Sequence, residues 1–359
     1  MNIYSSTKAA WHIDRIADMR AGRQAVPVNL QIIPSDYCQH DCTYCAYRAS
    51  NGISSSQFGG LDKAGKPTHN PLRMIPKEKV LEILEDAAAL GVKSITWTGG
   101  GEPTAHPDHL ELFERALDLG LECSMNTNGA VLRNGWQDIL PRFTYIRFSF
   151  DGSTPEEYAA IRRTSPAMFG KVVGNIAAVV GEVKRRNSDC VIGVGYVVTP
   201  DLHESTRRAV EVLRDTGVTY VRLASMQSTE GAAVYGDRLI HARDSVRRAC
   251  QLARPGFDVI DLFDAALGKR MSDPFCGFQQ LVLYIGGNQK VYRCCYVAYS
   301  QPGEIGDLRN QRFSEWFESD GKQSAIENFD ARGCGTCPLV EKNATIAAMV
   351  KAPPHVNFV

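Results

Sequence analysis

The feature that most constrains the fold is a regular alternation of apolar, β-rich runs with segments of helical periodicity. The runs that read as strands are 28–33, 94–97, 122–125, 145–150, 190–198 and 220–223. Between them, apolar residues recur about every 3.6 positions over 77–90, 107–119, 168–186 and 204–216. Such alternation predicts parallel βαβ units with right-handed crossovers. Because six strands are too few for a closed eight-stranded barrel, we predict an α/β fold built on an open, partial (β/α)6 barrel.

A cysteine-rich loop follows the first predicted strand. Cys38, Cys42 and Cys45 stand in the run CQHDCTYC, which is a C-x3-C-x2-C spacing. Three thiolates from one short loop are too few to close a tetrahedral structural zinc site. They suit an iron–sulfur cluster with one iron left open to bind a small ligand. The spacing alone leaves open a zinc site that borrows a distant fourth ligand. His40, inside this loop, is expected to be exposed.

Polar turns end three of the later predicted strands. The second strand runs into the turn Gly99-Gly100-Gly101-Glu102-Pro103. Consecutive glycines let the backbone approach a ligand closely, and their amides can meet its polar groups. Asn126 begins the turn after the third strand, while Ser149 and Asp151 end the fourth. By themselves, the last two turns are as well explained by the preference of Asn-Gly and Asp-Gly for positive φ.

The cysteine spacing, with Tyr44 just before its last cysteine, and the glycine-glutamate turn together resemble the signature of the radical S-adenosylmethionine (SAM) superfamily. The resemblance implies a [4Fe–4S] cluster whose open iron chelates the amino and carboxylate groups of SAM. An electron from the cluster then cleaves SAM to a 5′-deoxyadenosyl radical, which abstracts hydrogen from the substrate. A flavodoxin- or ferredoxin-like protein is the implied electron donor.

The same resemblance assigns the residues that contact SAM. They are Tyr44, Gly99, Gly100, Gly101, Glu102, Asn126, Ser149, Asp151 and Arg162. Glu102 or neighbouring backbone carbonyls are expected to receive the SAM ammonium. Arg162, near the end of the predicted helix 156–163, matches an arginine that reaches the SAM carboxylate in related enzymes. Arg163 here replaces the glycine that usually follows.

A second set of cysteines lies beyond the predicted barrel. Its members are Cys276, Cys294 or Cys295, Cys334 and Cys337, and the segment 284–294 reads as a hairpin that ends in a ligand. Four thiolates satisfy zinc as well as iron. The order resembles the SPASM auxiliary-cluster domain or its shortened form, twitch. Because no cysteine follows Cys337, the resemblance implies one auxiliary [4Fe–4S] cluster. The resemblance places the ligand at Cys294, directly after Val-Tyr-Arg, and leaves Cys295 spare. Neighbouring side chains in an extended segment point to opposite faces, so we expect only one of the two to bind.

These patterns predict five regions. They are an N-terminal helical extension over 1–23, the core barrel over 24–240, a connecting helical region over 241–275, a small α+β twitch-like domain over 276–340 and a tail over 341–359. The irregular stretch 46–75, rich in Ser, Gly and Asn, is predicted to be a substrate lid.

Charge and hydropathy limit the partners. The 40 basic and 40 acidic residues give no global attraction to nucleic acid or to an anionic membrane. The first twenty residues do not form a signal peptide, and no apolar run is long enough to span a bilayer. Eleven cysteines without a secretory signal therefore predict a reducing, cytoplasmic setting and metal ligation.

The substrate is the least constrained part of the prediction. We expect a small polar molecule, such as an aminosugar or a nucleoside, that is oxidised or rearranged. Peptide-modifying relatives often carry an N-terminal leader-recognition domain, and only thirty-seven residues precede Cys38. Alternatives are maturation of a ribosomally made peptide and modification of a nucleic-acid base. An iron–sulfur scaffold or sensor is the alternative outside enzymology, but it leaves the glycine-glutamate turn without a role.

Overall fold

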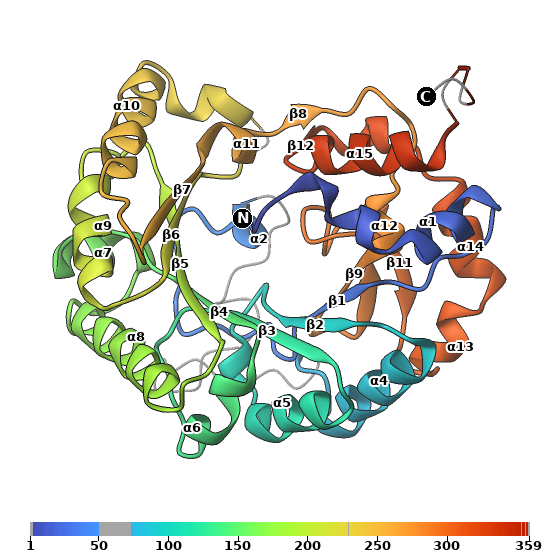
Figure 1. Cartoon of the computed structure of the whole chain (residues 1–359), viewed down its shortest axis with the longest axis horizontal. Coiled ribbons are helices and arrows are strands. Elements are labelled where there is room, and N and C mark those ends of the chain that lie inside the picture. The colour runs from blue at the N-terminus through green and yellow to red at the C-terminus, as the bar shows by residue number, and fades with distance from the viewer. Residues whose placement is uncertain (1–2, 50–72, 229, 353, 356, 358–359) are drawn as a thin grey trace, which may run out of the picture.

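A continuous sheet organises the chain, whose computed structural model describes residues 3–49, 73–228, 230–352, 354–355 and 357. The parallel strands are β1 (Asn29–Ile32), β2 (Ser94–Trp97), β3 (Glu122–Thr127), β4 (Tyr145–Ser149), β5 (Val191–Val198), β6 (Tyr220–Ser225) and β7 (Asp258–Leu262). Three more strands follow, β9 (Val282–Ile285), β10 (Lys290–Tyr292) and β11 (Glu304–Asp307). The ten-stranded order is β11-β10-β9-β1-β2-β3-β4-β5-β6-β7, and its curvature is seen in Figure 1.

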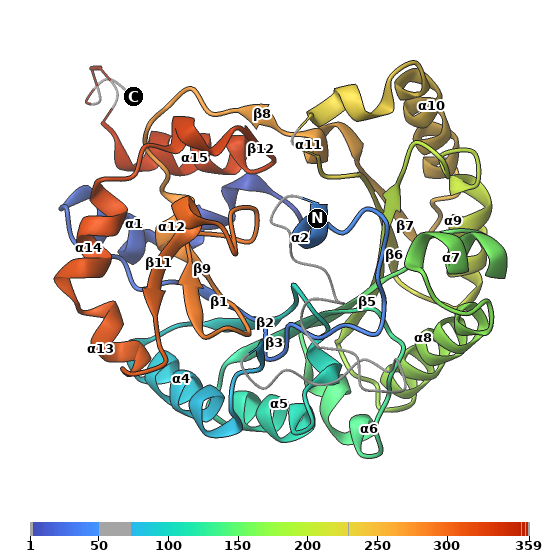
Figure 2. The same ribbon diagram turned by 180° about the vertical axis from the view of Figure 1, so that it is seen from behind.

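Helices cover the outer face of this curved sheet, as Figures 1 and 2 show. The longer ones are α4 (Lys77–Leu90), α5 (His109–Asp118), α7 (Pro155–Arg162), α8 (Ala167–Arg185), α9 (Thr206–Asp215) and α10 (Arg238–Cys250). Short elements complete this part, α2 (Ala46–Ala49), α6 (Trp136–Ile139), α11 (Phe263–Leu267) and the 3-10 turns Pro103–Ala105, Leu140–Arg142 and Gly231–Tyr235.

The two ends of the chain pack against each other. The N-terminal elements are η1 (Ser6–Trp11) and α1 (Ile13–Arg20). The C-terminal ones are β8 (Lys269–Arg270), α12 (Phe278–Leu281), α13 (Phe313–Phe317), α14 (Asp320–Glu327), β12 (Thr336–Cys337), α15 (Val340–Val350) and the 3-10 turns Gln301–Gly303 and Ala331–Cys334. Figures 1 and 2 show α15 beside the N-terminal helices.

The strands divide their side chains between two faces, because successive residues of a strand point to opposite sides. In β4, Ile146 and Phe148 are fully buried in the core between sheet and helices. In β5, Val194 and Tyr196 belong to the same core. The alternate residues, such as Arg147 on β4, therefore face the concave interior of the barrel.

The predicted partial barrel is confirmed, and three details differ from the sequence-based expectation. The region 241–275 is not purely helical, because β7 lies in it and pairs parallel to β6. The expected tail from 341 onward instead forms most of α15. The hairpin β9–β10 lies within the predicted twitch-like region 276–340 but continues the barrel sheet, because β9 pairs parallel to β1. The predicted lid falls largely on residues 50–72, which lie outside the described residues.

No single helix in the described part of the chain is long and apolar enough to cross a membrane. The pair α7 and α8 passes the length and composition test only when taken together, and it is bent by 99°.

Candidate functional site

The cysteine loop leaves the carboxyl end of β1 and reaches α2. It is fastened to the last turn of α7, where helix carbonyls have no partner within the helix. The amide of Asp41 donates to the carbonyl of Arg162 at 3.1 Å, and that of Thr43 donates to Ile161 at 2.9 Å. A strand and a helix end therefore fix the backbone that carries Cys38, Cys42 and Cys45.

Two polar side chains point at sulfurs of this loop. Asn128 Nδ2 donates to Cys38 Sγ at 3.6 Å, and Arg162 Nη1 donates to Cys42 Sγ at the same distance. Burial raises the pKa of both thiols above the ordinary value. Metal binding would deprotonate them, and hydrogen bonds to sulfur are a recognised means of tuning iron–sulfur clusters. Three thiols in one loop with two such donors fit a cluster held by three cysteines.

The glycine-glutamate turn packs against the cysteine loop. A Cβ on Gly101 would lie 2.3 Å from the carbonyl carbon of Asp36, and one on Gly99 would lie 1.9 Å from the oxygen of Gly101. Side chains do not fit at these two positions, so glycine is required by close approach. The amide of Glu102 donates to the carbonyl of Tyr37 at 2.8 Å. The turn is thus joined to the residue that precedes Cys38.

The carboxylate of Glu102 is buried, with 2% of the residue exposed, and it accepts hydrogen bonds from the protein. Its Oε1 accepts from Thr104 N at 3.1 Å, Thr104 Oγ1 at 2.9 Å and Thr127 Oγ1 at 2.6 Å. Its Oε2 accepts from Asn128 N at 2.7 Å. Burial raises the pKa of Glu102 above its ordinary value. The carboxylate therefore links the turns after β2 and β3, and positions the residue that contacts Cys38.

Three of the predicted SAM residues meet at the end of β4. Asp151 is fully buried and forms an ion pair with Arg162, of whose side chain 4% is exposed. Asp151 also accepts hydrogen bonds from the hydroxyl of Tyr44 and, at 2.7 Å, from the amide of Val197 on β5. This buried network holds Arg162 over the cysteine loop.

The remaining predicted contacts lie nearby on the concave face. Asn126 Nδ2 donates to Thr98 Oγ1 at 3.2 Å, and its Oδ1 is buried without a hydrogen-bond partner in the described part of the chain. Ser149 is partly exposed at the end of β4. The Oδ1 of Asn126 and the hydroxyl of Ser149 are therefore both available to contact a ligand.

Two features of this loop differ from the expectation from the sequence. Asn128 contacts the sulfur of Cys38, whereas the predicted Asn126 contacts Thr98. The run Asn-Thr-Asn-Gly indicates a polar turn but not which asparagine faces the cysteines. The expected exposure of His40 was wrong, because it is 2% exposed and packs edge-on to Tyr158 at 6.0 Å. Burial, and then Arg162, lower the pKa of His40 to about 3.

The four predicted auxiliary ligands line one small cavity. They come from separate elements, Cys276 before α12, Cys294 after β10, Cys334 at the end of a 3-10 turn and Cys337 in β12. Burial raises the pKa of each thiol, that of Cys276 to about 11. The donor set and its common cavity fit a four-thiolate centre.

Arg293 borders this centre, whereas Cys295 does not. Arg293 lines the cavity, donates to Gln279 Oε1 at 2.6 Å and lies over the ring of Phe329 at 4.0 Å. Its positive charge can offset that of the thiolates. Cys295 packs instead with Tyr47 and Tyr299 in a separate cluster. Among the described residues, no three His, Cys, Asp or Glu side chains converge on a single metal-ion position.

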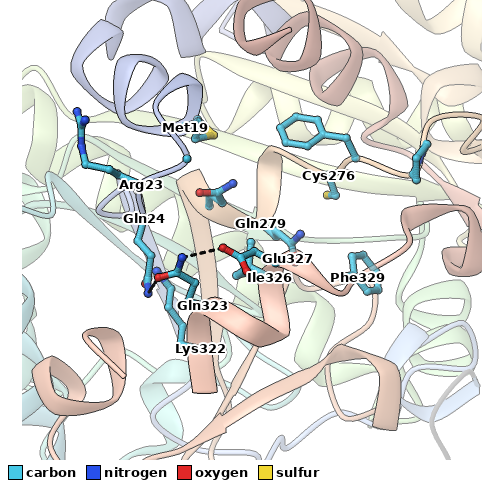
Figure 3. Close-up of a pocket in the computed structure, with 14 residues that line it drawn as sticks. Met19, Arg23, Gln24, Cys276, Gln279, Lys322, Gln323, Ile326, Glu327 and Phe329 are labelled. Atoms are coloured by element: carbon cyan, nitrogen blue, oxygen red, sulfur yellow. Dashed lines mark hydrogen bonds between the residues drawn. The ribbon is translucent and has the colours of Figure 1, made fainter. Parts of the chain in front are cut away.

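A larger cavity, of about 370 Å³, lies where α1, α12 and α14 meet (Figure 3). Its lining includes Met19, Gln24, Cys276, Lys322 and Phe329, but none of the predicted SAM residues. Lys322 is 2% exposed, and its Nζ lies 3.8 Å from the ring centroid of Phe317. Cys276 lines this cavity and the auxiliary one, so the two are adjacent.

Comparisons with known proteins agree with these motifs. The family model described as "Radical SAM superfamily" matches residues 32–219, more than half of the chain. The PqqA peptide cyclase of Granulibacter bethesdensis is 24% identical over 225 residues, which are 62% of this chain and 54% of that protein. The probable GTP 3′,8-cyclase of Pyrococcus abyssi is 32% identical over 104 residues, 29% of this chain and 28% of that protein. The chain thus spans about half the length, or less, of these curated relatives.

A solved structure resembles the fold over nearly the whole chain. SuiB of Streptococcus suis, bound to its precursor peptide SuiA, superposes with a TM-score of 0.61 at 16% identity. The match covers 95% of this chain and 79% of that one, so it includes the C-terminal cysteine region.

Proposed function

The chain belongs to the radical SAM superfamily and is an enzyme that uses SAM and a [4Fe–4S] cluster, and on that premise we propose that it modifies a peptide by hydrogen abstraction. When bound, the cluster and SAM supply a 5′-deoxyadenosyl radical. The observation that carries the proposal is the cysteine loop, with Asn128 and Arg162 donating to its sulfurs. The fastening of that loop to β1 and α7 keeps it in place.

The assignment of residues is part of this proposal. Cys38, Cys42 and Cys45 hold the SAM-binding cluster. Gly99 to Gly101 approach the methionine end of SAM with their backbone, and their carbonyls receive its ammonium. Asn126, Ser149 and Tyr44 border the same space. Glu102 is a positioning residue, because its carboxylate is occupied by donors of the chain.

Arg162 has two tasks in this scheme. Its Nη1 lies by the Cys42 sulfur, while Asp151 pairs with its Nη2. Asp151 therefore orients the guanidinium, which can then meet the carboxylate of SAM with its remaining donors. The buried pair keeps the positive charge beside the cluster.

We further propose that residues 276–340 form an auxiliary-cluster unit, in which Cys276, Cys294, Cys334 and Cys337 hold one [4Fe–4S] cluster. Their common cavity supports this assignment. A zinc ion with the same four thiolates is the alternative. Metal analysis separates the two, because the iron proposal requires about eight irons per chain in total and the zinc alternative about four.

A peptide substrate is preferred over the small polar molecule expected from the sequence. The PqqA peptide cyclase relative and the likeness to a fold that binds a precursor peptide both support it. A nucleotide is the second candidate, because GTP 3′,8-cyclases are also among the curated relatives.

Anaerobic reconstitution with iron, sulfide, SAM and dithionite tests the chemistry. The wild-type protein should form 5′-deoxyadenosine, and the variant with Cys38, Cys42 and Cys45 changed to Ala should form none. That variant should still hold the auxiliary cluster. Cys250→Ala, outside both cysteine sets, is the matched control and should keep the activity. Undiminished 5′-deoxyadenosine from the triple variant would show that the catalytic cluster is elsewhere.

A further inference from the structure

Two arginines face the concave interior of the barrel from neighbouring positions. Arg147 lies on β4 and Arg222 on β6, with β5 between them. In the register of the sheet, Arg147 is paired with Gly193 and Arg222 with Gly195. Their strand neighbours Ile146 and Val221 are buried against the helices, so both arginines point to the opposite face.

The strand between the arginines leaves room beside them. Gly195 lies on the same face, and a Cβ there would be 3.5 Å from Arg147 Cδ. At Gly193 the ring of Tyr220 fills the corresponding space, with its Cζ 2.2 Å from the position of a Cβ. The ring of Tyr220 therefore fills the interior beside Gly193, whereas space remains beside Gly195, two residues further along β5.

Neither guanidinium has an acidic partner in the described part of the chain. Arg147 Nη1 donates to the hydroxyl of Tyr4 at 3.4 Å, which is long for a hydrogen bond. Arg222 lies 5.9 Å from the ring of Tyr4, and its Nε is buried without a partner among the described residues. Lys342 of α15 is a third positive group and lies within electrostatic range of Arg222. Partly buried charges without counterions are costly, so this cluster is incomplete as it stands.

The surrounding groups favour a negative oxygen at this point. Burial, and then Arg147, lower the pKa of Arg222. Burial raises the pKa of Tyr4, but the nearby charges of Arg147 and Arg222 outweigh it and lower that pKa below its ordinary value. The hydroxyl of Tyr4 thus occupies a place where the protein stabilises an anion. Other titratable groups near the arginines are the phenols Tyr145, Tyr220 and Tyr296 and the thiol of Cys295.

We propose that the barrel interior between Arg147 and Arg222 binds an anionic group of the substrate, a carboxylate or a phosphate. This site rests on the proposed function, because it lies below the SAM residues of the same barrel. Arg147 precedes Ser149 by two residues on one face, roughly 7 Å along the strand. An anion held there anchors the substrate beneath SAM and leaves its remainder near the strand ends, where the radical forms. Bidentate guanidinium contacts suit both anions.

Titration calorimetry with two probes tests the site and identifies the source of the anion. The reconstituted enzyme with SAM is titrated with N-acetylglutamate α-amide, which imitates a peptide carboxylate, and with inorganic phosphate. Binding of the first alone indicates a peptide carboxylate, and binding of the second alone indicates a nucleotide phosphate. Arg147→Gln and Arg222→Gln should each weaken binding about tenfold or more, because charge-assisted hydrogen bonds are lost. Arg238→Gln, an exposed arginine of α10 paired with Asp201, is the control.

A third variant blocks the proposed site without removing a charge, and stability measurements show whether each variant is folded. Gly195→Val keeps both arginines and suits a strand, but its methyl groups occupy the space beside Arg147, so it should also weaken binding about tenfold or more. Thermal unfolding and iron content check that each variant is folded. If the wild type binds neither probe, or if all three variants bind as tightly as the wild type, the anion site is refuted. Formation of 5′-deoxyadenosine by the wild type is measured separately. Cleavage of SAM without probe binding refutes only the anion site, whereas probe binding without cleavage refutes only the proposed chemistry.

Discussion

Glu102→Gln offers the sharpest test of how the SAM site is built, because it preserves shape and changes only charge and hydrogen-bonding type. If Gln keeps its oxygen at the Oε1 position, the three bonds from Thr104 and Thr127 survive. Its NH₂ group then faces the amide of Asn128, which donates to Oε2 at 2.7 Å in the wild type. In the opposite orientation the NH₂ group faces the amide of Thr104, while the hydroxyls of Thr104 and Thr127 can accept from it, so one backbone donor again loses its acceptor.

The magnitude follows from this count. One charge-assisted hydrogen bond is lost, worth about 1.5–3 kcal/mol, and the Asn128 N–H is left buried without an acceptor. The raised pKa of Glu102 shows that burying its charge is costly, so the neutral amide regains part of the loss. We expect the free energy of unfolding of the variant to be about 2 kcal/mol lower than that of the wild type.

Urea unfolding of the cofactor-free protein and SAM titration of the reconstituted protein are measured together. A positioning role predicts loss of stability in both Glu102→Gln and Glu102→Ala, with SAM affinity falling about tenfold or more in the Ala variant and iron content unchanged. Glu111→Gln, an exposed glutamate of α5, is the control. If Glu102→Gln unfolds like the wild type but loses SAM affinity, the carboxylate contacts SAM directly and the positioning argument fails.

Three further predictions concern separate parts of the chain. Cys294→Ala should lose about four irons per chain while Cys295→Ala keeps them, and the reverse result would move the ligand by one residue. Asp151→Asn should lower the free energy of unfolding by about 3–5 kcal/mol, because it leaves Arg162 as a buried unpaired charge; a loss below about 1 kcal/mol in urea unfolding would contradict this. Burial lowers the pKa of Lys322 from 10.5 to about 7, so the unfolded chain binds more protons between these values and stability rises with pH there. Lys322→Met should remove this rise in urea midpoints, and an unchanged slope would refute it.

The sequence predicted the barrel well where the pattern is local. Strand β2 and helix α4 begin and end at the predicted residues, because alternation and helical periodicity are properties of short windows. The replacement of a glycine by Arg163 is a second feature that the sequence indicated. The φ at this position is 49°, in the left-handed region that glycine favours. Arg163 therefore has a backbone conformation that suits the glycine usually found at this position in the family.

Features set by distant parts of the chain were not predictable in this way. His40 is buried because Tyr158 of α7 packs on it, and nothing within its own loop indicates that contact. Glu102 turns inward because donors from the end of β3 reach it, whereas the motif alone indicates only an acidic side chain near a ligand. Strand β7 is short, and its exposed residues Asp258 and Asp261 lie on opposite faces, so the run shows no clear alternation without its partner β6.

The pairing of β1 with β9 relates the two cysteine sets to each other. Strand β1 leads into the loop of Cys38, and β9 leads through the hairpin to Cys294, so their parallel register fixes both starting points. Asp36, fully buried between them, accepts hydrogen bonds from Gly287 N at 3.2 Å and from the hydroxyl of Tyr299. A buried carboxylate that joins the segment after β1 to the segment after β9 resists sliding of one element past the other. The position of the auxiliary cysteines relative to the cysteine loop is thus set by the sheet itself.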